Sequence, residues 1–182
     1  QAINAPHREK SRDRVLNNEE LVSIYTAAGE MGGAFGSIVQ VLILTAQRRN
    51  EVSEMTWSEL ELDNNLWTIP GTRTKNDKPH FVHLSEQTTT LLSSIKNTSD
   101  FVFTSNDKSP FSGFSKSKKR LNELSGVTDW RLHDIRRTVT SGMAQLGIAP
   151  HIADKILNHQ SGTISGVAAV YQRHEFLDER KK

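Results

Sequence analysis

The sequence predicts a mainly α domain with a small antiparallel β-sheet, an α+β fold. Three observations support this class. Most of the chain carries apolar residues at helical spacing, two short stretches are rich in β-branched and aromatic residues, and turn-forming residues separate those two stretches. The length of 182 residues, of which 35% are hydrophobic, suits one domain that buries its own core.

The N-terminal part is predicted to consist of a polar leader followed by helices. Residues 1–16 are polar and mixed in charge, so we expect a linker or the end of a missing upstream domain. Asn17 or Asn18 can cap the first helix, because two acidic residues and then apolar residues follow. Glycines end that helix, a second helix is predicted over residues 34–45, and a short third one runs from residue 50 towards 55.

The periodicity changes after the third helix. Residues 66–70 and 81–84 are typical of strands, and the turn formers of 71–80 predict a hairpin between them. Residues 101–103 form another short extended piece. Further helices are predicted over residues 85–95, 111–124, 134–146, 150–158 and 166–180.

Composition excludes several classes of protein. The chain has no cysteine, which excludes disulfides, a thiolate nucleophile and cysteine-ligated metal centres. No apolar run approaches the length of a transmembrane helix. Residues 1–63 carry 6 basic and 10 acidic side chains, whereas residues 64–182 carry 17 basic and 11 acidic ones. This asymmetry is compatible with one surface that faces nucleic acid, but it is a weak signal.

Several polar residues stand where a helical domain does not need them. Arg48 follows an apolar helix directly and precedes Glu51 by three residues, and His133 precedes Arg136 by one helical turn. Three further positions complete the set: Lys75 in the predicted hairpin, His159 after a predicted helix, and Tyr171 beyond it.

In order and spacing, these residues resemble the catalytic domain of the tyrosine recombinase (phage integrase) family over about residues 14–182. The resemblance implies that residues 17–182 are the catalytic domain and that the missing upstream domain binds DNA. The chain departs from the pattern at Ala46, where the family commonly has glycine. We expect Ala46 to fit an ordinary helical backbone, with small geometric effects and no loss of activity.

The resemblance implies a phosphotyrosine mechanism without metal or cofactor. Tyr171 would attack a DNA phosphate, and Arg48 and Arg136 would stabilise the transition state with planar, permanently charged donors. His133 would accept the Tyr171 proton or donate to the phosphate, His159 would bind a non-bridging oxygen, and Lys75 would protonate the 5′-oxygen. Glu51 carries the wrong charge for phosphate, so it would orient Arg48 or His133.

Each assignment has a plain structural alternative. Arg49 competes with Arg48, and Arg73 and Lys78 share the loop of Lys75. Arg137 is expected to belong to a helix face. Isolated histidines, tyrosines and charged loops are more often helix caps, core residues and solvated surface than catalytic groups.

Other features carry less weight. His80 and His83 would lie on opposite faces of a strand, which argues against a metal site there. The tryptophans are expected to pack in the core or at its edge. A basic run on the helix predicted over 111–124 is either a solvated face or a contact with the DNA backbone. It contains Lys116, Lys118, Lys119 and Arg120.

The resemblance implies a site-specific recombinase that integrates or excises a prophage or genomic island. Its expected partners are double-stranded DNA at attachment sites, three further copies of the full-length protein, and a directionality factor, with no membrane. This chain alone is expected to be monomeric, and the expected location is the cytoplasm of a bacterium, with a bacterial or phage origin. Two alternatives stay open: DNA relaxation of the type IB topoisomerase kind, and a non-catalytic DNA-binding regulator.

Overall fold

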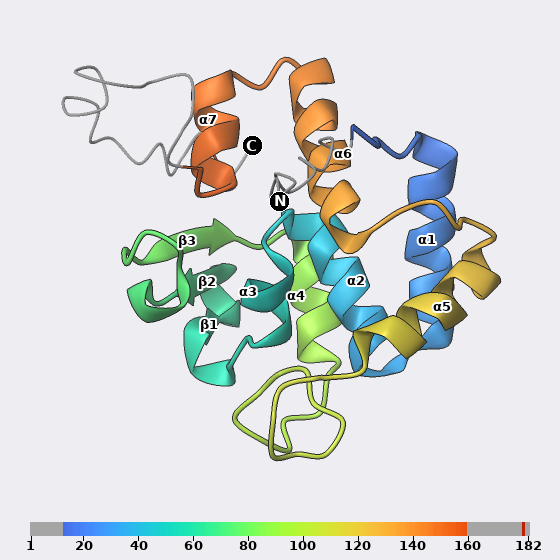
Figure 1. Cartoon of the computed structure of the whole chain (residues 1–182). Coiled ribbons are helices and arrows are strands. Elements are labelled where there is room, and N and C mark those ends of the chain that lie inside the picture. The colour runs from blue at the N-terminus through green and yellow to red at the C-terminus, as the bar shows by residue number, and fades with distance from the viewer. Residues whose placement is uncertain (1–12, 160–179, 181–182) are drawn as a thin grey trace, which may run out of the picture.

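The computed structural model describes residues 13–159 and Arg180 and has a mostly helical domain with one three-stranded antiparallel sheet (Figure 1). The predicted fold class is therefore confirmed. Within the described part of the chain, no helix combines the length and the apolar character that crossing a bilayer requires. The α-helices are α1 (Asn18–Met31), α2 (Gly33–Thr45), α3 (Arg49–Ser53), α4 (Glu86–Ser93), α5 (Phe114–Ser125), α6 (Leu132–Gln145) and α7 (Pro150–Ile156).

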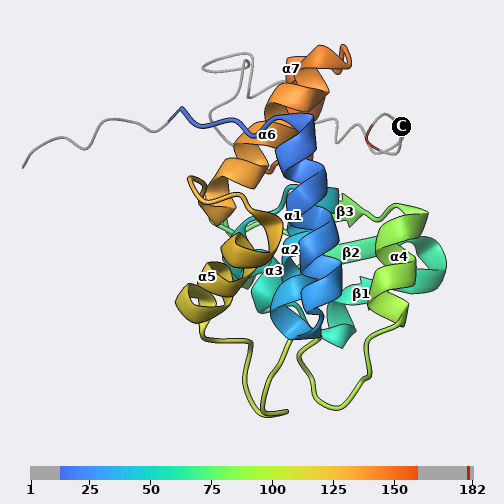
Figure 2. The same ribbon diagram turned by 90° about the vertical axis from the view of Figure 1, so that its right-hand side faces the viewer.

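Helix α2 forms the centre of the domain because it is apolar around most of its circumference. Its buried residues include Phe35, Ile38, Val39 and Leu42, and it contacts α1, α3, α4 and α6. A helix with this pattern is stable only when other elements cover it on several sides. Figure 2 shows α1 in front of α2, with α5 on one side and the sheet and α4 on the other. The predictions for α1, α2 and α3 are confirmed to within a residue or two at their ends.

Two features fix how α1 packs. Asn17 caps it, because Asn17 Oδ1 accepts a hydrogen bond from Glu20 N at 2.8 Å and Glu20 Oε2 accepts one from Asn17 N at 2.9 Å. At the other end α1 and α2 approach closely at Gly36, where a Cβ atom would lie 2.2 Å from the Ala28 carbonyl oxygen. Only glycine allows this approach without a backbone shift.

The described end of the polar leader is part of the packed domain. Leu16 is buried, and its backbone N–H donates to Thr138 Oγ1 on α6 at 2.9 Å. Arg14 pairs with Glu20 at the start of α1. Residues 13–16 thus attach the chain to α6, although the sequence predicted a linker over residues 1–16.

The sheet consists of β1 (Leu60–Glu61), β2 (Leu66–Ile69) and β3 (His80–His83), in that order. The predicted hairpin between β2 and β3 is confirmed, with Leu66 opposite His83 and Ile69 opposite His80. Strand β1 was not predicted, because two residues are too few to show an alternating pattern.

Other differences from the sequence prediction have local causes. Helix α5 starts at Phe114 rather than 111, because the Phe111 N–H donates to the Phe103 carbonyl at 2.8 Å and holds residue 111 in an extended segment. Helix α6 starts at Leu132 rather than 134, because Asp134 Oδ2 accepts the Arg131 N–H at 2.8 Å and so caps the helix. The helix predicted over 166–180 lies outside the described residues, apart from Arg180.

Candidate active site

Arg48 is held at the start of α3 by the carboxylate of Glu51. Glu51 Oε2 accepts the Arg48 backbone N–H at 2.8 Å, and Glu51 Oε1 accepts a hydrogen bond from Arg48 Nη1 at 2.7 Å. The Glu51 side chain is 3% exposed and the Arg48 side chain 30% exposed. Of the two partners that the sequence left open for Glu51, the structure places it against Arg48.

Arg136 projects from α6 into the interior and is 5% exposed. Its Nη1 donates to the Ala46 carbonyl at 2.7 Å, and its Nη2 donates to the Leu157 carbonyl. Burial, followed by the charge of Arg48, lowers the pKa of Arg136 to about 10, and Glu51 acts in the opposite direction. The guanidinium therefore remains charged at neutral pH.

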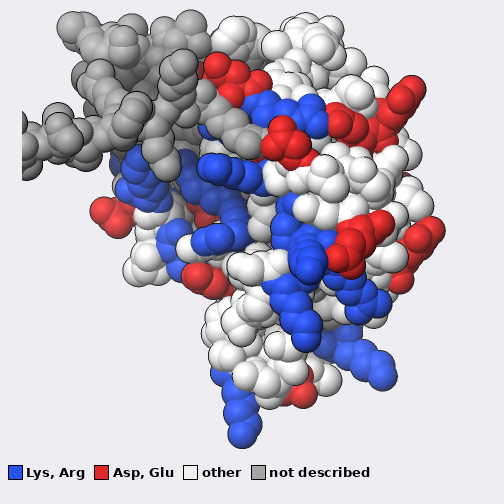
Figure 3. All heavy atoms as spheres, turned by 45° about the vertical axis from the view of Figure 1, so that its right-hand side comes forward, with Lys and Arg blue, Asp and Glu red and all other residues white. Residues whose placement is uncertain are grey.

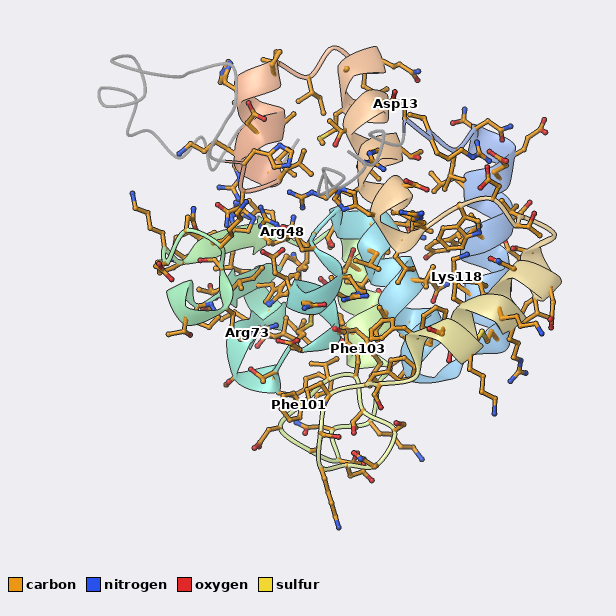
Figure 4. All side chains as sticks on the ribbon, viewed as in Figure 1. Asp13, Arg48, Arg73, Phe101, Phe103 and Lys118 are labelled. Carbon is orange, nitrogen blue, oxygen red and sulfur yellow. The ribbon has the colours of Figure 1, made fainter. Side chains whose placement is uncertain are left out.

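The two arginines converge on the C-terminal end of α7. Arg48 Nη2 donates to the Asn158 carbonyl at 3.1 Å, next to the Leu157 carbonyl that Arg136 binds. Carbonyls at a helix end have no partner within the helix and carry partial negative charge. Figure 4 shows Arg48 near this end of α7, between α7 and the sheet. Folding thus brings to one helix end two guanidinium groups that are far apart in the sequence.

The expectation that Ala46 has an ordinary helical backbone is wrong, because its backbone is left-handed. Ala46 ends α2 with φ 54° and ψ 20°, a conformation in which a Cβ atom costs about 1–2 kcal/mol. Its methyl group is 1% exposed and packs with Met143, Ala153 and Leu157, and this burial offsets part of the strain. The turn aims the Ala46 carbonyl at Arg136.

Two histidines, His133 and His159, lie close enough to the arginines to feel their charge. His133 is exposed at the first turn of α6, and burial, Arg137 and Arg136 lower its pKa. His159 follows α7, with Nδ1 3.4 Å from Asp154 Oδ1. Burial and Arg136 lower the pKa of His159, although Asp154 opposes the shift. Both imidazoles are therefore mainly neutral at pH 7.

The basic residues of the hairpin loop differ in whether other side chains and the backbone hold them. Arg73 is committed to structure, because it pairs with Glu59 and donates to the Glu51 carbonyl at 2.7 Å. Lys75 and Lys78 are exposed. The loop reaches the end of α7 through Asn76 Nδ2, which donates to Asn158 Oδ1 at 2.9 Å. Lys75 is thus next in sequence to a residue that contacts the Arg48 site, whereas Tyr171 lies outside the described residues.

A cavity of about 600 Å³ opens beside the two arginines. Arg48, His133 and Arg136 line one end of it, and Arg49, Lys118 and Arg131 line the rest together with the rings of Phe114 and Trp130. Figure 3 shows lysine and arginine side chains gathered across the middle of one face of the molecule.

The four DNA-backbone candidates on α5 are not equivalent. Among them only Lys118 lines the cavity, whereas Lys116, Lys119 and Arg120 are exposed. Figure 4 shows Lys118 toward α5 and Arg48 toward the end of α7, apart from each other in this view. Trp130 is buried, as predicted, yet one face of its ring carries the Lys118 ammonium.

Sequence reasoning missed the buried pair of His80 and Gln47. His80 is 5% exposed, and its Nε2 lies 3.2 Å from both Gln47 Oε1 and the Ile156 carbonyl. Because both partners are acceptors, Nε2 carries the proton. Burial, followed by Arg180, lowers the pKa of His80 to about 3. The pair ties β3 to α7 and to the segment before Arg48, a role that only the strand alternation at His80 could have suggested.

His80 and His83 do face opposite sides of β3, as the sequence predicted. Among the described residues, no group of three or more histidine and acidic side chains is arranged to hold a metal ion.

Comparisons with known proteins show the family and the fold of the chain. The model of the phage integrase family matches residues 14–176. Prophage integrase IntA of Escherichia coli (strain K12) is 25% identical over 143 residues, which cover 76% of this chain and 34% of IntA. The chain therefore spans about a third of the length of that curated relative.

Two solved structures share the fold. The crystal structure of XerA recombinase matches with a TM-score of 0.71 and 22% identity, over 83% of this chain and 58% of XerA. A lambda integrase tetramer bound to a Holliday junction matches with a TM-score of 0.64 and 20% identity, over 86% of this chain and 50% of that one. Because the family model covers most of its length, the chain belongs to the phage integrase family.

Proposed function

We propose that this chain is the catalytic part of an enzyme that cleaves and rejoins DNA through a 3′-phosphotyrosine. The observation that carries the proposal is the convergence of Arg48 and Arg136 on adjacent carbonyls at the end of α7. Such a pair of preorganised guanidinium groups suits the charge that develops on a phosphate during displacement.

The electrostatics of the site favour an anion. The charge of Arg48 disfavours the charge of Arg136, as the effect of Arg48 on the pKa of Arg136 indicates. Glu51 and the carbonyls of residues 46, 157 and 158 compensate only part of the positive charge. A phosphate that binds between the guanidinium groups would supply the rest, in charge-assisted and bidentate hydrogen bonds.

In the proposed reaction the Tyr171 oxygen attacks the scissile phosphorus. The bond from phosphorus to the 5′-oxygen breaks, and the tyrosine becomes linked to the 3′-phosphate. His133, mainly neutral at pH 7, accepts the phenol proton, and Lys75 donates a proton to the departing 5′-oxygen. His159 donates to a non-bridging oxygen. Attack by a 5′-hydroxyl of a partner strand reverses these steps, so the energy of the ester is retained.

The biological context is integration or excision of a prophage or a genomic island. The similarity to a prophage integrase supports this assignment. The similarity to a lambda integrase tetramer on a Holliday junction supports a tetramer of the full-length protein on paired attachment sites. The reaction would take place on DNA in the bacterial cytoplasm, with a directionality factor to choose between integration and excision.

The chain has two tyrosines, so the test can compare the proposed nucleophile with a control tyrosine. The protein is incubated with a pool of nicked duplexes of randomised sequence, and covalent complexes are separated on a denaturing gel. We expect wild-type protein and Tyr25→Phe to form an adduct, and Tyr171→Phe to form none while it retains DNA binding. Tyr25 is a fair control because its hydroxyl only accepts a hydrogen bond from Gln87.

Three results would contradict the proposal. No adduct with wild-type protein would favour a non-catalytic regulator. An adduct that persists in Tyr171→Phe would mean that another residue is the nucleophile. Relaxation of any supercoiled plasmid without site preference would favour the topoisomerase alternative.

A further inference from the structure

The cavity is larger and more positive than a single phosphate requires. Its volume of about 600 Å³ is in the range of sites that enclose whole small-molecule ligands. Five of its lining residues are arginine or lysine, and none of the described residues that line it is aspartate or glutamate. The two catalytic arginines account for one end only, so three cations at the other end have no assigned ligand.

Lys118 is the best placed of these three cations. Its Nζ lies 3.6 Å from the centre of the Trp130 ring and donates to Asn122 Oδ1 at 2.5 Å. Because an ammonium group has three N–H donors, at least one remains for a ligand in the cavity. The ring attracts the cation, and no aspartate or glutamate is among the residues that line the cavity.

The charge of Lys118 is kept partly away from water. Burial lowers the pKa of Lys118 to about 8, and Asp134 opposes that shift. A second cation of the same kind lies nearby, since the Arg49 guanidinium stacks 5.1 Å from the centre of the Phe114 ring. Two cations on aromatic rings therefore line one cavity, Lys118 half-buried and Arg49 exposed.

We infer that the Lys118 end of the cavity is a second phosphate site, which binds a backbone phosphate next to the scissile one on the same DNA strand. Lys118 makes the direct contact, and Arg49 and Arg131 flank it. This inference rests on the proposed function. The shared cavity supports it, because Lys118, His133 and Arg136 all line the same cavity and a single strand bound there could reach all three.

The first test is the salt dependence of binding to a random-sequence duplex. Lys118→Met keeps an unbranched, mainly apolar side chain at this position and removes the charge over the Trp130 ring. We expect its slope of log affinity against log salt to be smaller than that of wild type by about 0.9, the value for one lost phosphate contact. An unchanged slope in a folded Lys118→Met protein would overturn the inference. Lys118→Gln serves if the methionine variant does not fold.

The second test locates the phosphate. Duplexes that carry one ethylated phosphate per strand are converted to covalent adducts, and the adducts are sequenced. Wild-type adducts should lack molecules ethylated at one phosphate beside the cleaved one, with a depletion of about tenfold, as expected for a charged hydrogen bond. Lys118→Met should lose this depletion, and Lys119→Met, which removes an equal charge from the exposed face of α5, should keep it.

The two proposals fail in different ways. Adduct formation with equal depletion in wild type and Lys118→Met would remove the second phosphate site and leave the catalytic assignment intact. If wild-type protein forms no adduct, the catalytic proposal fails, and the salt slope still decides whether Lys118 contacts a phosphate.

Discussion

The two ends of the cavity hold positive charge in different ways. At the end that we propose to be catalytic (Arg48, His133 and Arg136; the catalytic end), backbone carbonyls and a buried carboxylate fix the arginines. At the ring end (Arg49 and Lys118), the cations rest on the faces of Phe114 and Trp130, and each makes one hydrogen bond, to the side chain of Asn50 and of Asn122 respectively. Hydrogen bonds set the direction of each guanidinium, whereas an aromatic face attracts a cation without fixing its donors.

This difference suits two tasks. A transition state gains most from donors that are already oriented, because no reorganisation is needed when charge develops. A backbone phosphate that is only bound gains from a cation that can adjust its position. The comparison therefore predicts that substitutions at the catalytic end change the rate of cleavage, and that substitutions at the ring end change binding and its salt dependence.

The largest expected effect is on the rate of adduct formation when Arg136 is substituted. Arg136→Lys keeps a cation but cannot span the carbonyls of Ala46 and Leu157. We expect the rate of adduct formation to fall by about 10²- to 10³-fold, as when one transition-state donor is lost. Arg137→Lys is the matched control, since Arg137 pairs with Asp134 on the same helix. Equal rates for the two variants, measured under single-turnover conditions, would contradict the fixed-donor view.

A smaller loss of cleavage rate is expected when Glu51 is substituted. Glu51→Gln retains one acceptor for Arg48, but its amide N–H₂ then faces a second donor. We expect cleavage to slow by about 10- to 100-fold while DNA affinity changes little, by analogy with groups that orient metal ligands. Glu54→Gln, at an exposed position after α3, should match wild type. A loss of affinity without a loss of rate would assign Glu51 to binding instead.

His80 should make the stability of the catalytic end depend on pH. Its folded pKa is about 3 and its ordinary value 6.5, so the unfolded chain binds more protons between these values. Stability is therefore present above pH 6.5 and is lost as the pH falls, by about 2 kcal/mol at pH 5. Urea titrations should show that His80→Gln lacks this component.

The control for His80 is His83→Gln, on the opposite face of β3. It should keep the loss of stability at pH 5. If His80→Gln and wild type lose equal stability between pH 7 and pH 5, the buried neutral His80 is not the source of the effect.

The smallest effect is expected on the free energy of unfolding when Ala46 is substituted. Ala46→Gly relieves about 1–2 kcal/mol of left-handed strain, but it loses about 0.8 kcal/mol of methyl burial and adds freedom to the unfolded chain. We expect the free energy of unfolding to change by less than about 1 kcal/mol. Ala153→Gly, in the helical backbone of α7, should destabilise by about 1–2 kcal/mol. An equally large loss at both positions in urea titrations would mean that Ala46 is unstrained.

The sequence predicted most elements because their signals are local. The Asn17 cap, the apolar helix before Arg48 and the hairpin of β2 and β3 each lie within a dozen residues. Strand β1 was missed because it exists only through its pairing with β2. Ala46 was assigned the wrong backbone because its left-handed turn depends on packing against α6 and α7.

The sequence by itself determined the family, the central helix and the identity of the candidate catalytic side chains, since residue types and their spacing carry that information. Only the tertiary structure decided that Arg48 and Arg136 meet at the end of α7, that Arg73 is a structural residue, and that Lys118 alone of the basic run on α5 lines the cavity. These facts depend on contacts between segments distant in the chain, and the hydrogen-bond partners and burial that define them exist only after folding.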